Sequence, residues 1–132
     1  HFVSMWTSVF GKENEKIYGM LQSVKVPKYL LSNTNEVAWG HLSQSHIVGK
    51  HFPHGDHQVL SFREGVVKPG KEIYHRAIRK AGVSFPEAIL IDDRPENIET
   101  WTKLGGKGIL YNANGCAAML QYHLITNGLF DF

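Results

Sequence analysis

Two adjacent carboxylates follow an apolar run in the second half of the chain. Residues 88–91 are short, apolar and rich in β-branched side chains, which predicts a buried parallel strand ending at Asp92 and Asp93. Pro95 then opens a helical pattern, for which Asp93 is a candidate N-cap with Glu96 as its capping-box partner. Neighbouring carboxylates repel each other unless a cation is close, and Mg²⁺ prefers oxygen ligands. The pattern therefore predicts either a metal-binding pair or, more simply, a capping Asp93 beside a solvated Asp92.

Two other expected strand ends also carry polar groups. An apolar strand delivers Ser32 and Asn33 to a helix N-terminus, and hydroxyl, amide and backbone N–H groups all donate to phosphate oxygens. Lys68 precedes Pro69, which restricts it to an extended conformation, and its ammonium can balance an anion or a crowded carboxylate. Taken singly, each has a simpler interpretation: a helix-capping turn at Ser32 and Asn33, and a solvated surface side chain at Lys68.

An alternation of strands and helices must position these side chains. Hydrophobic periodicity predicts helices over residues 2–10, 14–25, 34–42, 70–81, 95–104 and 114–124. It predicts strands over residues 28–32, 58–62, 88–92 and 108–111. Repeated β-α units of this kind predict an α/β fold with a mostly parallel sheet and right-handed crossovers. Since ligands bind at the carboxyl ends of parallel strands, we expect the three polar groups to meet there.

Composition sets broader limits. The chain has 132 residues, enough for one domain, and its 42% hydrophobic and 20% charged residues are typical of a soluble globular protein. A net charge of +2 is too small to predict binding to nucleic acid or to an anionic membrane. No apolar run reaches membrane-spanning length, and no signal peptide is visible. The single cysteine, Cys116, fits a reducing compartment, and we expect a cytoplasmic protein.

In combination, Ser32-Asn33, Lys68-Pro69 and Asp92-Asp93 with Asn97 resemble the motifs of the haloacid dehalogenase-like (HAD) hydrolase superfamily. The resemblance extends over residues 28–111 and is greatest to the phosphatase branch with a small helical cap. It implies a three-layer, Rossmann-like parallel sheet with helices on both faces. Residues 1–24 would then be the remnant of the cap and its return helix, and residues 25–132 the core.

The resemblance also implies roles for individual residues. Ser32 and Asn33 would bind the phosphoryl group, and Lys68 would bind it and balance charge during catalysis. Asp93 would bind Mg²⁺ as a catalytic residue, and Asp92 and Asn97 would support it. The family reaction is attack by an aspartate on phosphorus, followed by hydrolysis of the aspartyl-phosphate.

One family motif is missing. The nucleophile belongs to an Asp-x-Asp sequence after the first strand, but the aspartates of this chain are Asp56, Asp92, Asp93 and Asp131, all of them after Ser32. We therefore expect a chain that lacks the central first strand of the sheet, is inactive as it stands, and derives from a longer phosphatase. A partner strand or a second copy of the chain could fill the resulting gap.

Other functions remain open. A non-catalytic HAD-like binding or regulatory module would keep the fold and the phosphate donors, and a metal-free haloacid dehalogenase is a more distant alternative. The expected ligand is a small phosphorylated metabolite of unspecified identity, with no role for nucleic acid or membrane. The histidines between His51 and His57 could in principle bind zinc, but this segment lacks cysteine and matches an ordinary loop of the family.

Overall fold

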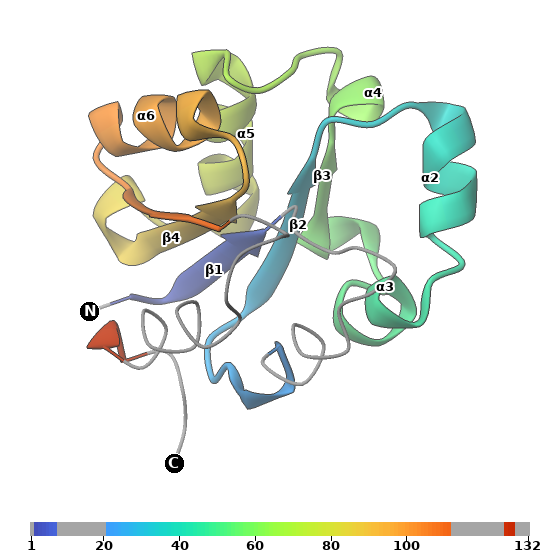
Figure 1. The fold of residues 1–132 in the computed structure, drawn as a ribbon, viewed down its shortest axis with the longest axis horizontal. Coiled ribbons are helices and arrows are strands. Elements are labelled where there is room, and N and C mark those ends of the chain that lie inside the picture. The colour runs from blue at the N-terminus through green and yellow to red at the C-terminus, as the bar shows by residue number, and fades with distance from the viewer. Residues whose placement is uncertain (1, 8–20, 112–125, 129–132) are drawn as a thin grey trace.

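The computed structural model describes residues 2–7, 21–111 and 126–128 of the chain. The helix expected over residues 114–124 and Cys116 lie outside these ranges, as does most of the helix expected over 14–25. The described residues form a five-stranded parallel sheet with the order β3-β2-β1-β4-β5 (Figure 1). The expected α/β fold with a parallel sheet is confirmed. The strands are β1 (Ser4–Thr7), β2 (Lys28–Ser32), β3 (Gln58–Leu60), β4 (Ala88–Asp92) and β5 (Lys107–Leu110).

The start of the chain forms the central strand, which corrects two predictions. We expected a helix over residues 2–10 and a sheet without its central strand, but β1 lies between β2 and β4. Trp6 is in register with Tyr29 on one side and with Leu90 on the other. All four residues of β1 are buried, and an extended segment there satisfies backbone groups of both neighbouring strands. Ser4–Thr7 therefore belongs to the core sheet and not to a cap, and no partner strand is needed to fill the gap.

Helices cover both faces of the sheet. On one face, Met5, Leu30 and Ile89 pack against α2 (Glu36–Leu42) and α3 (His46–His51). On the other face, their chain neighbours Trp6, Leu31 and Leu90 pack against α5 (Lys71–Ala81) and α6 (Pro95–Lys103). Adjacent strand residues point to opposite faces, so each strand contributes to both cores. This is the three-layer arrangement that the sequence predicts.

The helix boundaries follow from local sequence. The helix predicted over 70–81 is observed as Lys71–Ala81, and Gly82 ends it with a φ of 68°, a left-handed conformation that glycine adopts without steric cost. The strand predicted over 58–62 ends early, at Leu60, because Ser61–Glu64 turns into the short helix α4. Short 3₁₀ helices at Gly55–His57 and Phe85–Glu87 precede β3 and β4.

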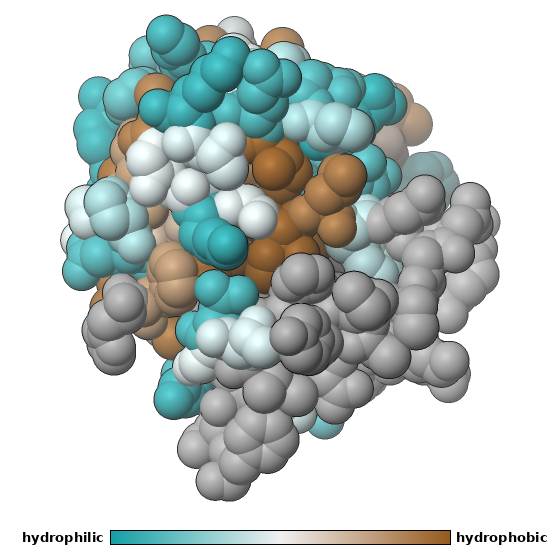
Figure 2. Space-filling view, turned by 60° about the vertical axis from the view of Figure 1, so that its left-hand side comes forward, coloured by the Kyte–Doolittle hydropathy of each residue, from teal (hydrophilic) through white to brown (hydrophobic). Residues whose placement is uncertain are grey.

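On the face shown in Figure 2, hydrophobic side chains gather near the centre, and hydrophilic side chains lie above them and to their left. At the end of the sheet, Leu110 of β5 is 53% exposed. Within the described ranges, no helix is both long enough and apolar enough to span a bilayer.

Candidate functional site

The three predicted strand ends converge on one cavity at the carboxyl edge of the sheet. The cavity has a volume of about 170 Å³, and all six residues proposed from the sequence line it together with one that was not proposed, Arg94. The lining residues are Ser32, Asn33, Lys68, Asp92, Asp93, Arg94 and Asn97. Ser32 ends β2 and Asp92 ends β4, while Lys68 lies in the loop between α4 and α5.

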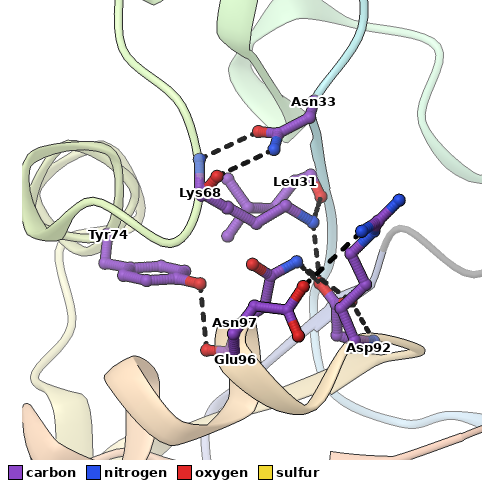
Figure 3. Close-up of polar contacts among 8 residues, drawn as sticks. Leu31, Asn33, Lys68, Tyr74, Asp92, Glu96 and Asn97 are labelled. Atoms are coloured by element: carbon purple, nitrogen blue, oxygen red, sulfur yellow. Dashed lines mark hydrogen bonds and ion pairs between the residues drawn. The ribbon is translucent and has the colours of Figure 1, made fainter.

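A buried ion pair joins two walls of this cavity. The Lys68 Nζ atom donates to Asp92 Oδ2 at 2.7 Å and to the backbone oxygen of Leu31 at 2.9 Å (Figure 3). Lys68 is 5% exposed and Asp92 is fully buried, so neither is the solvated surface residue of the simpler interpretation. Burial lowers the pKa of Lys68, and the Asp92 carboxylate offsets only part of that effect.

Asp92 is held on several sides. Its carboxylate accepts hydrogen bonds from the Asn97 side chain at 3.2 Å and from the Arg94 backbone N–H at 3.0 Å. Burial opposes the charge on Asp92, but Lys68 and these hydrogen bonds outweigh it and keep the pKa of the carboxyl below its ordinary value. Asp92 and Asn97 thus line the cavity together with Asp93, and their supporting role toward a metal at Asp93 stays a prediction.

Asp93 is free of the capping role that the sequence also allowed. The N-cap of α6 is Arg94, without a side-chain cap, so the predicted capping box of Asp93 and Glu96 is wrong. Among the described residues, none donates a hydrogen bond to the Asp93 side chain, which is exposed at the cavity. Proline at the first helical position tolerates this uncapped start because it has no N–H to satisfy.

Asn33 lines the cavity and also contacts the backbone of Lys68. Its side-chain oxygen accepts from the Lys68 backbone N–H at 2.9 Å, and its side-chain nitrogen donates to the Lys68 backbone oxygen at 3.0 Å. A second contact runs from a side chain after β3 to the backbone after β2: the Ser61 hydroxyl accepts from the Thr34 N–H and donates to the Thr34 oxygen, both at 2.8 Å. These two reciprocal contacts fasten the segment after β2 to the segment after β3, and so fix where Lys68 stands.

Three contributors were missed from the sequence. Arg94 and Ser61 have no local pattern that separates them from surface residues, and Tyr74 was expected only as an inward-facing helix residue. The buried Tyr74 hydroxyl donates to the Asn97 backbone oxygen at 2.9 Å, and burial raises the pKa of this hydroxyl. Tyr74 thereby ties α5 to the start of α6, where Asn97 holds Asp92.

The oxygen donors that line the cavity decide whether it suits Mg²⁺. Asp92 is occupied by Lys68, which leaves the Asp93 carboxylate as the oxygen group available to a cation. Mg²⁺ commonly binds through one or two carboxylates and completes its shell with water and phosphate oxygens. The described residues include no group of three histidine, cysteine or acidic side chains able to hold a metal by themselves. The donor chemistry therefore fits magnesium, held weakly.

The histidine-rich segment gives a pH prediction. The Lys28 ammonium donates to His51 Nδ1 at 2.9 Å, which requires an unprotonated Nδ1. Burial, followed by the charges of Lys28 and Lys50, lowers the pKa of His51 from 6.5 to about 4. Between these two pH values the unfolded chain binds the extra proton and the folded chain does not. The free energy of unfolding is therefore expected to fall as the pH is lowered from about 6.5 to about 4.

Urea unfolding at closely spaced pH values would measure this slope. In the His51→Gln variant, whose amide can still accept from Lys28, the free energy of unfolding should depend less on pH in this range. His54→Gln, at an exposed position, should show the same pH dependence as the unmodified protein. An unchanged slope in His51→Gln would contradict the assignment.

The comparisons with known proteins agree with this architecture. No family model and no curated sequence matches the chain. A solved structure of an uncharacterized protein from Corynebacterium glutamicum is similar with a TM-score of 0.78 at 16% identity, over 100% of this chain and 99% of that one. A HAD-family enzyme from Bacteroides thetaiotaomicron is similar with a TM-score of 0.66 at 25% identity, over 85% of this chain and 56% of that one.

The same enzyme has been solved in complex with magnesium and inorganic phosphate. A HAD phosphatase from Thermococcus onnurineus is similar with a TM-score of 0.66 at 15% identity, over 92% of this chain and 60% of that one. The chain thus spans 56–60% of the length of these two HAD-family proteins. The order of the parallel sheet, the residues gathered at its carboxyl edge and these similarities show that the chain has a haloacid dehalogenase-like fold.

Proposed function

We propose that the cavity is the phosphate site of a Mg²⁺-dependent phosphomonoester hydrolase of the HAD-like superfamily, and that the 132-residue chain binds phosphate there without hydrolysing its esters. The observation that supports it is the gathering of Ser32, Lys68 and Asp93 around one cavity of about 170 Å³. The magnesium and phosphate in the Bacteroides thetaiotaomicron enzyme support the choice of ligands.

Each group has a separate part in binding. The Ser32 hydroxyl donates to a phosphate oxygen, and the Lys68 ammonium, held by Asp92 and Leu31, adds a fixed positive charge beside it. Asp93 would hold the magnesium ion, which when bound neutralises charge on the phosphate oxygens. Asn33, Asn97 and Tyr74 keep these groups in place through the contacts described above.

We expect no turnover because no aspartate nucleophile follows β1 in the sequence. This strand lies between β2 and β4 and ends at Thr7, an uncharged residue, and the sequence has no aspartate before Asp56. Loss of the nucleophile in an unrelated hydrolase costs about 10⁶ in turnover, which would leave no measurable activity. The second candidate, a phosphate-binding module that is not a hydrolase, is favoured by the same observation, since the sheet is complete without an acidic residue at that place.

Two measurements on the 132-residue chain test the proposal. Calorimetry with inorganic phosphate should show weak binding that Mg²⁺ strengthens, and p-nitrophenyl phosphate should not be hydrolysed. Asp93→Ala should remove the effect of Mg²⁺, and Asp56→Ala, at an exposed position away from the cavity, should not. Phosphate binding that is independent of Mg²⁺ would favour the binding module. Failure to bind phosphate at all, or sustained turnover, would contradict the proposal.

A further inference from the structure

Arg94 places a second cation at the cavity. Its backbone is fixed there, because its N–H donates to Asp92 Oδ1 at 3.0 Å and the next residue, Pro95, begins α6. Its side chain is 69% exposed, so the guanidinium stands toward solvent and not inside the protein. Lys68, by contrast, is buried and engaged by Asp92 and Leu31. Of the two cations that the described residues contribute to the cavity, Arg94 is therefore the one that faces solvent.

The existing partner of Arg94 is weak. Its Nη1 atom lies 3.5 Å from Glu96 Oε1, and the Glu96 side chain is 52% exposed. Exposed ion pairs of this kind contribute little to stability, so the carboxylate of a ligand can replace Glu96 at little cost. A guanidinium also offers a planar pair of N–H donors, which can form two parallel hydrogen bonds with one carboxylate.

The size of the cavity decides which part of a ligand meets Arg94. A volume of about 170 Å³ equals the space of roughly six water molecules in the liquid. This accommodates a phosphoryl group, so the remainder of a phosphorylated ligand must extend out past the rim. The atoms next to the phosphoryl group then lie at the rim of the cavity, which Arg94 lines.

We propose that Arg94 makes the site prefer phosphorylated ligands that carry a second acidic group, of the carboxylate class, separated from the phosphoryl group by one or two carbon atoms. This inference rests on the proposed function, because it takes the phosphoryl group to occupy the cavity. It adds the chemical class of the ligand, which the fold does not specify.

A pair of non-hydrolysable probes tests the preference directly. 3-Phosphonopropionate and propylphosphonate have nearly the same size, but only the first carries a carboxylate. With Mg²⁺ present, the wild-type chain is expected to bind 3-phosphonopropionate roughly fivefold more tightly, the effect of an exposed pair worth about 1 kcal/mol. Arg94→Gln should reduce this ratio to about one. Glu96→Gln should raise it, because the competing carboxylate is gone.

The chain offers a closely matched control. Arg79 is also 69% exposed and lies 3.5 Å from a half-exposed glutamate, Glu72, but it is on α5 and does not line the cavity. Arg79→Gln removes the same charge from the protein and should leave the ratio unchanged. Higher salt should reduce the wild-type ratio toward that of Arg94→Gln, since exposed charges are screened.

The outcomes separate the two proposals. Equal binding of both phosphonates by the wild-type chain, or equal loss of the ratio in Arg94→Gln and Arg79→Gln, would overturn the role of Arg94 and leave the phosphate site intact. Failure of both phosphonates and of inorganic phosphate to bind would overturn the phosphate site, and the preference with it.

Discussion

Lys68→Met is expected to lower the free energy of unfolding by about 3–5 kcal/mol, the usual cost of removing one partner from a buried ion pair. The substitution keeps most of the side-chain volume but leaves the fully buried Asp92 without its cation. The pKa of Asp92, which Lys68 holds low, should rise at the same time. Urea unfolding followed by circular dichroism would measure the loss.

Two further variants isolate the cause. Lys68→Met combined with Asp92→Asn should recover much of the loss, because the amide leaves no buried charge and can still accept from the Arg94 N–H. Lys103→Met removes an exposed pair, with Glu99 at 2.8 Å, and should cost less than about 1 kcal/mol. A loss in Lys68→Met no larger than that in Lys103→Met would contradict the buried-pair account.

Trp101→Ala is the second substitution for which we expect a large effect. Trp101 is fully buried between α6 and the sheet, donates to the Lys107 oxygen at 3.1 Å, and packs edge-on against Tyr74 and Phe85. Truncation of a buried tryptophan leaves a large cavity and costs about 3–5 kcal/mol. Because α6 carries Asn97 and Arg94, phosphate binding should weaken together with stability. Thermal unfolding would record the loss.

Gly106, which lies against the Trp101 indole, provides an independent test of how tightly that side chain is packed. A Cβ added at Gly106 would lie within 2.6 Å of several indole atoms, so Gly106→Ala should also destabilise the protein, by about 1–3 kcal/mol. Thr102→Ala, at an exposed position on the same helix, should have little effect. If Trp101→Ala cost no more than Thr102→Ala, the indole would not be part of the core.

The sequence predicts the parts of the site that depend on strand ends. Ser32 and Asp93 were placed at one edge because parallel strands deliver their carboxyl ends together, and both line the cavity. Lys68 also lines it, but from the loop after α4 and not from a strand end. Residues 88–92 were predicted as a strand and are observed as one, since a short β-branched run flanked by turn residues has few alternatives.

The wrong predictions have a common origin in long-range contacts. The aromatic residues Phe2, Trp6 and Phe10 have helical spacing, but residues 4–7 form a strand because β2 and β4 provide partners that no local pattern reveals. The amide of Asn33 contacts the backbone of Lys68, 35 positions away, which no local pattern predicts, and its binding of phosphate stays a prediction. The sequence gives no signal for Arg94, because an exposed arginine is ordinary on any surface.

The central place of β1 also bears on how the chain assembles during synthesis. β1 leaves the ribosome well before β4, yet Ser4 pairs with Ala88 and the middle of the sheet closes only when both are present. Contacts so distant in sequence must wait for a large loop to close, which slows folding and keeps an apolar strand exposed in the meantime. On the nascent polypeptide, the side of β1 that faces β4 therefore stays unpaired until Ala88–Asp92 has emerged.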